Sequence, residues 1–250
     1  MHFFLENEDN ILKRIREILG SNADNFSILE HQVDIKVQVE YYEFSRKQKT
    51  NEDVKDILLK ESDLYRSDID LEKKKTLLVN LASIEKPEAY RILQKYLSEA
   101  QPDIKDWAIM ACQESRMLLE TRLLDEQQVF ISTGLGGKGR KLRYFVVFFP
   151  QSENGFNETE QKVMSSELEF VLRRYNGDIE EVHFFDRFAT ILALIPLNVA
   201  VKQPFQQTID ECNSLRNYIK KEFIITNVKI LDAKEIDEIV KYPEGEINIE

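Results

Sequence analysis

The sequence predicts an α+β protein with a helical amino-terminal half and an antiparallel sheet with packed helices in the carboxyl-terminal half. Apolar residues recur at helical spacing through residues 53–124, whereas short apolar runs of strand length alternate with helical segments after residue 127. The 250 residues are 42% hydrophobic and include only eight glycines and six prolines, so the chain can bury the cores of two ordinary domains. We therefore predict a mainly helical domain over 1–126, an α+β sandwich over 127–242 and an acidic tail over 243–250.

Residues 9–41 predict one helix and one strand. Residues 9–19 carry apolar side chains at helical spacing, and Gly20 follows as a C-cap. Residues 33–41 alternate apolar and polar side chains, which is typical of a half-buried strand. Residues 26–29 either extend that strand or pair with it.

Four helices are expected next, after a polar loop at 45–51. Two of them follow Pro87 and Pro102, which suit a first helical turn because that turn has no backbone donor to lose. The four predicted helices are Asp53–Tyr65, Leu71–Ile84, Glu88–Leu97 and Ile104–Leu124.

Part of this helical region resembles a known repeat family. The run PEAYRILQKYL at 87–97, the run QPDIKDWA at 101–108 and Ala111 resemble a HEAT-like hairpin, in which an apolar helix meets a Pro-Asp turn and an alanine-bearing second helix. Residues 71–84 resemble the second helix of an earlier copy. The resemblance covers about residues 69–121 and implies a stack of helical hairpins used as a binding surface. An ordinary helical bundle is the alternative.

The second half predicts strands and helices in turn. The expected strands are 128–133, 142–149, 179–185, 188–195 and 223–231, and the expected helices are 156–175, 204–222 and 233–240. From residue 142 the order is strand, helix, strand, strand, helix, strand, as in the ferredoxin-like fold. The first and third of these strands are the most continuously apolar, which suits the centre of a sheet.

A second topology stays open at this point. If residues 128–133 pair with 142–149 as a hairpin, they take the edge that the last ferredoxin-like strand needs. A repeated strand-strand-helix layout would avoid that conflict. The Phe149-Pro150 and Ile195-Pro196 strand endings suit it.

The glycine-rich loop at 134–139 is the chemically suggestive run. It holds four of the eight glycines, and no acidic residue occurs between Glu126 and Glu153. The pattern fits G-x-G-x-x-G, but a strand follows where a dinucleotide site needs a helix, and Lys138 is not followed by Ser or Thr as in a P-loop. The His-Arg-Asp and Asp-Phe-Gly motifs of protein kinases do not occur in the sequence. The predicted binding residues are Gly134, Gly136, Gly137, Lys138, Gly139, Arg140, Lys141 and Arg143.

Catalytic and metal sites are not predicted. His2, His31 and His183 are scattered, and the sequence has no His-x-x-x-His, Cys-x-x-Cys or Gly-x-Ser-x-Gly pattern. His183 lies near several acidic residues in sequence, and we interpret it as a surface or strand-edge histidine. We predict no cofactor.

Charge and composition limit which partners are expected. A net charge of -11 makes nucleic acid an unfavourable partner overall, and no apolar run is long enough for a signal peptide or a membrane span. Two widely separated cysteines indicate reduced thiols and a cytoplasmic location. We therefore predict a non-catalytic protein-interaction or regulatory protein that binds a protein partner or itself. The alternative is an α+β domain, enzymatic or not, that binds an anionic small molecule, a nucleotide or RNA at residues 134–141.

Overall fold

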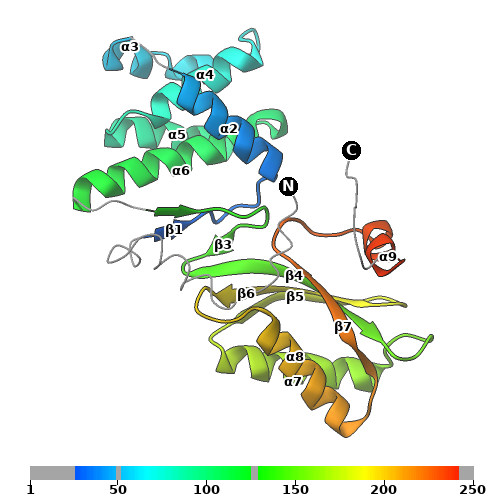
Figure 1. Cartoon of the computed structure of the whole chain (residues 1–250). Helices are drawn as coiled ribbons and strands as arrows, with labels where there is room; N and C mark the ends of the chain where they lie inside the picture. The colour runs from blue at the N-terminus through cyan, green and yellow to red at the C-terminus, as the bar shows by residue number, and fades with distance from the viewer. Residues whose placement is uncertain (1–25, 49–51, 125–128, 242–250) are drawn as a thin grey trace.

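The computed structural model describes residues 26–48, 52–124 and 129–241. Figure 1 shows a helical part stacked above a sheet whose other side is covered by two helices. The predicted α+β class is confirmed, with helices mostly in the first half of the chain and the main sheet in the second. The predicted helix at 9–19 and the acidic tail lie outside the described residues. None of the helices in the described ranges has the length and apolar character needed to cross a membrane.

The helical part contains α2 (Ile35–Lys47), α3 (Val54–Leu59), the 3₁₀ turn η2 (Glu61–Leu64), α4 (Leu71–Ala82), α5 (Pro87–Glu99) and α6 (Pro102–Leu124). In α5, Pro87 occupies the first turn, and the buried Ala89, Leu93 and Tyr96 follow at four- and three-residue spacing. This stripe shares one core with α4 and α6. The HEAT-like resemblance of this region stays a prediction.

Residues 33–41 are not the predicted strand. They lead into α2, where the N-cap side chain of Asp34 accepts the backbone N–H of Lys36 at 2.7 Å. The side chains of α2 that point inward recur at helical spacing. They are Val37, Gln38, Tyr41, Phe44 and Ser45. Ile35 and Val39, which the alternation placed inside, are 40% and 51% exposed. The prediction was wrong because it treated every polar residue as outward-facing, whereas the buried Gln38 completes the helical pattern.

The main sheet has ferredoxin-like topology. Its long strands are β4 (Lys141–Pro150), β5 (Asp178–Phe184), β6 (Ala189–Pro196) and β7 (Ile219–Thr226), all antiparallel, in the order β7–β4–β6–β5. Helix α7 (Glu158–Arg174) joins β4 to β5, and α8 (Lys202–Leu215) joins β6 to β7. The first and third strands of the unit are therefore central, as predicted, and the strand-strand-helix repeat is not the observed layout.

The expected competition for one edge of β4 does not arise. The short strand β2 (Val129–Ile131) pairs in parallel with β1 (Phe26–Ile28), not with β4. Strand β3 (Gly137–Lys138) pairs only with the first two residues of β4, and β7 pairs with β4 from Phe145 onward. One edge of β4 is long enough to accept both strands.

The boundary between α8 and β7 also differs from the prediction of a helix to residue 222 and a strand over 223–231. Helix α8 ends at Leu215, and β7 already begins at Ile219. The side chain of Asn213 closes this turn, since its Oδ1 accepts the amides of Tyr218 and Ile219 at 3.1 and 3.0 Å. This turn, closed by a side chain, stands where the next helical turn was predicted. It depends on polar hydrogen bonds, so the spacing of apolar residues does not reveal it.

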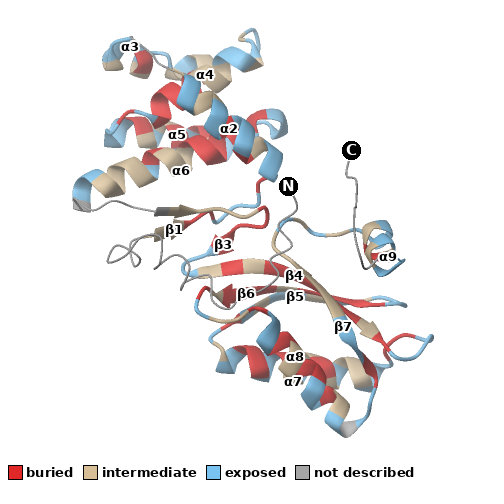
Figure 2. Ribbon diagram, viewed as in Figure 1, coloured by how far each residue is buried: buried red, intermediate tan, exposed pale blue. Residues whose placement is uncertain are grey.

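The two faces of the sheet have different coverings. One face buries the even-numbered side chains of β4 from Leu142 to Phe148 against α7 and α8, whose buried sides point toward the sheet in Figure 2. We call the opposite side the open face. It is covered in part by α9 (Ala233–Lys241), whose Ile236 is buried in a small core with Leu135, Phe145, Val147 and Phe188. The open face is therefore the place where the sheet has room for another molecule.

Candidate functional site

The glycine-rich segment is a packed junction rather than a free loop. Gly134, Gly136 and Gly137 are buried, and a Cβ atom at any of them would lie within 2.5 Å of a backbone oxygen of another segment. Three consecutive amides of the segment already donate to protein carbonyls: Leu135 to Asn227 at 2.9 Å, Gly136 to Thr133 at 3.2 Å and Gly137 to Leu29 at 2.8 Å. These amides are therefore not available to an anion, and the glycines serve close backbone packing.

The cationic residues after this segment are spread over different contacts. Lys138 and Gly139 are exposed at the turn between β3 and β4. The guanidinium of Arg140 lies over the ring of Phe26, 4.3 Å from its centroid. Lys141 pairs with Asp178 at 2.5 Å. A binding role for these residues stays a prediction.

Arg143 is the most firmly held of the predicted site residues. Its Nη2 donates to Glu180 Oε1 at 2.9 Å, and its Nε donates to the other oxygen of the same carboxylate. Its Nη1 donates to the carbonyls of Leu135 at 2.7 Å and Glu30 at 3.3 Å. The Glu180 carboxylate raises the pKa of the Arg143 guanidinium, because it hydrogen-bonds the charged form. Arg143 thus joins the sheet to the junction, which is a structural task.

A cavity of about 300 Å³ lies on the open face, between the sheet and the segment that carries α9. We call it the aromatic cavity. It is lined by Phe145, Glu181, His183, Phe185, Phe188, Thr190, Leu192, Ile230, Leu231, Asp232, Ala233 and Ile236. Strand register explains the grouping, because Phe145 pairs with Leu192 and Leu192 with Glu181, so one row of side chains crosses three strands. Because side chains alternate between the two faces along each strand, this row lies on one face of the sheet.

The floor of the cavity is apolar and aromatic. Phe145 and Phe188 are 5% and 6% exposed and form part of the small core under α9. Phe185, just after β5, is 51% exposed at the edge of the cavity. Its ring centroid lies 5.1 Å from that of Phe188, with the ring planes at 45°. A ring of this kind at the rim of a concave apolar surface offers area for a ligand to cover.

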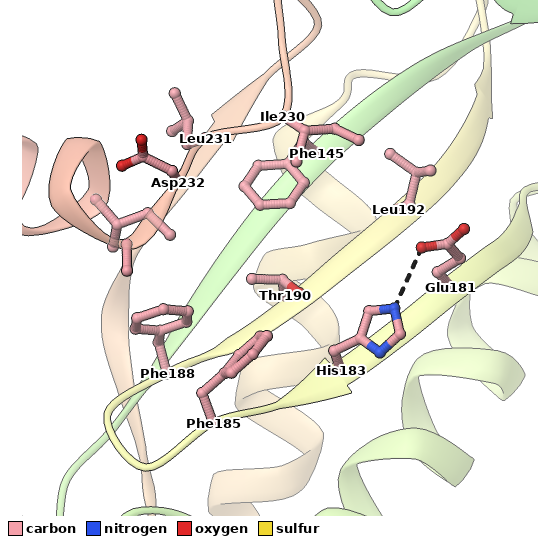
Figure 3. A pocket seen from close by; sticks show the side chains of 12 residues that line it. Phe145, Glu181, His183, Phe185, Phe188, Thr190, Leu192, Ile230, Leu231 and Asp232 are labelled. Atoms are coloured by element: carbon pink, nitrogen blue, oxygen red, sulfur yellow. Dashed lines mark hydrogen bonds and ion pairs between the residues drawn. The ribbon is translucent and has the colours of Figure 1, made fainter.

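The polar groups of the cavity come from two walls. Figure 3 shows Glu181 and His183 on β5 at one side and Asp232 at the other, with Phe145 and Thr190 between them. His183 Nε2 lies 3.2 Å from Glu181 Oε2. None of the described lining residues is Lys or Arg.

The second wall is fixed by the amino end of α9. Oδ1 of Asp232 accepts the amides of Lys234 and Glu235 at 2.8 and 2.9 Å. In the other direction, Oε2 of Glu235 accepts the amide of Asp232 at 3.0 Å. The bond from the Glu235 amide lowers the pKa of the Asp232 carboxyl, because it stabilises the charged form. An ion pair of 2.8 Å between Arg187 and Asp237 ties the middle of α9 to the loop between β5 and β6. The cavity therefore has a built wall on each side.

Sequence reasoning did not find this cavity. The available signal was that β4 and β6 are apolar on both faces although the two long helices of a ferredoxin-like unit cover only one. The i and i+2 spacing of Glu181 and His183 also placed both on the same side of a strand. The described residues contain no group of three or more His, Cys, Asp or Glu side chains positioned to hold a metal ion.

Comparisons with known proteins give partial structural likenesses only. No family model matches the chain, and no curated protein matches it. One similar solved structure is a REP-associated tyrosine transposase bound to a REP hairpin, with 10% identity, 42% of this chain and 65% of that chain covered, and a TM-score of 0.32. Another is a protein assigned as a transposase from Deinococcus radiodurans R1, with 7% identity, 43% and 92% coverage and a TM-score of 0.33.

These findings correct the functional predictions made from sequence. We predicted a non-catalytic protein-interaction protein with nucleic acid an unfavourable partner, and gave a ligand loop at 134–141 as the alternative. The two solved structures named above are instead described as transposases, one of them bound to a REP hairpin, and neither is described as a HEAT-like or protein-interaction module.

Proposed function

We propose that this protein binds a small aromatic molecule in the aromatic cavity on the open face of the sheet. The observation that carries the proposal is an apolar hollow of about 300 Å³ that combines three phenylalanine rings with a few polar groups at its walls. Ligand sites in proteins have this size and this lining, with polar groups that orient the ligand.

Phe185 supports the proposal through its exposure. The Phe185 ring is half exposed beside the buried ring of Phe188. A planar molecule that covers it removes apolar surface from water, which favours binding. Aromatic side chains on the open face of a four-stranded sheet also stack nucleobases in several nucleic-acid-binding modules. Free bases and a short single strand therefore belong among the molecules to be tested.

Ligand-induced stabilisation tests this function. The melting temperature of the full chain is measured with benzamide, indole, adenine, cytosine and a short single-stranded oligonucleotide, and binding is then quantified by calorimetry. We expect at least one of the ring compounds to raise the melting temperature in a concentration-dependent manner. If none of them does, the proposal is wrong.

A matched pair of variants locates the site. Phe185→Ala removes an exposed ring at the cavity, and Phe170→Ala removes an exposed ring on α7, on the other side of the sheet. Binding should weaken about tenfold in Phe185→Ala, because the stacked area is lost. It should be unchanged in Phe170→Ala. Equal binding by both variants would place the ligand elsewhere.

A cytoplasmic location is part of the same proposal. Cys112 and Cys212 are free thiols, which suits a reducing compartment. Cell fractionation followed by detection of the native protein checks this, and recovery from an oxidising compartment would count against it.

A further inference from the structure

We infer that the aromatic cavity selects cations, and that its ligand is an aromatic ring bearing an amidinium or ammonium group. This inference rests on the proposed function and adds the charge of the ligand to it. The observation behind it is the placement of Glu181 and Asp232 on two different walls of one apolar cavity, with the phenylalanine floor between them.

The carboxylate on the α9 side is held in place by the fold. Oδ1 of Asp232 accepts two amides at the start of α9, and Ile236, one turn further on, is buried against the sheet. These two bonds use one carboxylate oxygen and leave the other outside the cap. Asp232 is therefore a negative group held at the edge of the cavity, with its carboxylate drawn toward α9 in Figure 3.

The carboxylate on the β5 side is placed by strand register. Glu181 pairs across the sheet with Leu192, whose other neighbour is Phe145, so its side chain rises from the same row as the cavity floor. His183 lies beside it, 3.2 Å from Oε2. Glu181 is therefore the carboxylate of this wall, with His183 as its neighbour.

Cations lie near the α9 wall but do not line the cavity. After the backbone hydrogen bond from Glu235, the charges of Lys234 and Lys229 also stabilise the ionised Asp232 carboxylate. Two carboxylates on α9 hold cations from other segments: Asp237 pairs with Arg187 at 2.8 Å, and Glu235 pairs with Lys229. Each of these cations already faces a carboxylate that does not line the cavity. Among the described residues that line the cavity, the carboxylates are Glu181 and Asp232, and none is Lys or Arg.

A ring with a positive group fits this arrangement on three counts. Its plane covers the phenylalanine floor, its N–H groups donate to carboxylate oxygens, and its charge is attracted by both walls. A ring with a carboxylate or phosphate would bring a like charge against Glu181 and Asp232 while gaining the same apolar contact. The cavity should therefore discriminate by charge among ligands of the same shape.

Three ligands of nearly equal shape test the inference. Benzamidine, benzamide and benzoate share a ring and a planar substituent and carry positive, zero and negative charge. We expect benzamidine to bind about tenfold tighter than benzamide, and benzoate to bind more weakly than benzamide. If benzoate binds as tightly as benzamidine, the inference is wrong but the proposed function stands. If neither benzamide nor any other ring compound binds, the proposed function itself fails.

Charge-removing variants assign the selectivity to the two walls. Glu181→Gln and Asp232→Asn keep the shape of each side chain, and asparagine caps a helix as well as aspartate does. The preference for benzamidine over benzamide should fall several-fold in each variant. Glu211→Gln, an exposed carboxylate on α8 across the sheet, is the matched control and should keep the full preference. A preference that survives in both wall variants would overturn the assignment.

Discussion

Gln38 of helix α2 donates a 3.1 Å hydrogen bond from its side-chain amide to the backbone carbonyl of Thr133, directly before the glycine-rich segment. The same amide nitrogen donates to the carbonyl of Val33 at 2.9 Å. One buried side chain thus ties the helical part to the segment that enters the sheet. Next to it, the amide of Val33 donates to the carbonyl of Gly134 at 3.2 Å, so the junction is held from both chain segments.

We predict that Gln38→Leu destabilises the protein although it adds an apolar side chain of similar size. The substitution leaves the Val33 and Thr133 carbonyls short of a donor in a buried place, which costs about 1–3 kcal/mol. Denaturant unfolding followed by circular dichroism measures the loss. Gln94→Leu, which removes an exposed hydrogen bond to Tyr90, is the control and should change stability by much less. Equal losses of unfolding free energy in the two variants would contradict the prediction that the buried Gln38 amide contributes more than an exposed one.

Two glycines with the same backbone conformation give a second prediction. Gly136 and Gly139 have φ angles of +66° and +60°, so an alanine is strained at both by about 1–2 kcal/mol. At Gly136 the new Cβ would also lie 2.5 Å from the carbonyl oxygen of His31, whereas nothing lies within 4 Å of it at Gly139. We expect Gly136→Ala to cost at least about 2 kcal/mol more than Gly139→Ala.

Unfolding curves of the two glycine variants check this. Since the φ strain is common to both, the difference between them reports the packing of the junction alone. A Gly139→Ala variant as unstable as Gly136→Ala would mean that the turn between β3 and β4 is held more tightly than its open surroundings indicate.

The thiol of Cys112 gives a prediction that depends on pH. Burial raises the pKa of Cys112 from 9.0 to about 11, because the thiolate is poorly solvated. At pH 8 its alkylation should be on the order of a hundredfold slower than that of an ordinary thiol, since the thiolate is the reactive form. The folded pKa lies above the unfolded one, so this group's contribution to stability is complete below pH 9.0 and is lost as the pH rises through about 11.

Alkylation kinetics read out by peptide mass spectrometry test the Cys112 prediction. The denatured protein is the control and should react at the ordinary rate. Fast alkylation of Cys112 in the folded protein at pH 8 would contradict the partial burial of this side chain.

Local and redundant signals in the sequence were enough to define many of the elements. The helices α4, α5 and α6 show apolar residues at helical spacing, and α5 and α6 also begin with a proline. The strands β4 and β6 are apolar on both faces, which is typical of strands in the centre of a sheet. The same reasoning failed at residues 33–41, where a strict alternation is equally compatible with a helix once the buried Gln38 is counted as an inward residue.

The roles of the glycines and of the open face depend on long-range packing. The same glycine pattern suits a ligand loop or a packed crossing, and the choice depends on whether another backbone, here Leu29–His31 and Val228, lies against it. In the same way, Glu181, Phe145 and Asp232 become one cavity only when β5, β4 and the start of α9 are brought together by strand pairing. Contacts between residues distant in sequence arise from the pairing of whole elements, and a local pattern carries no information about which elements will meet.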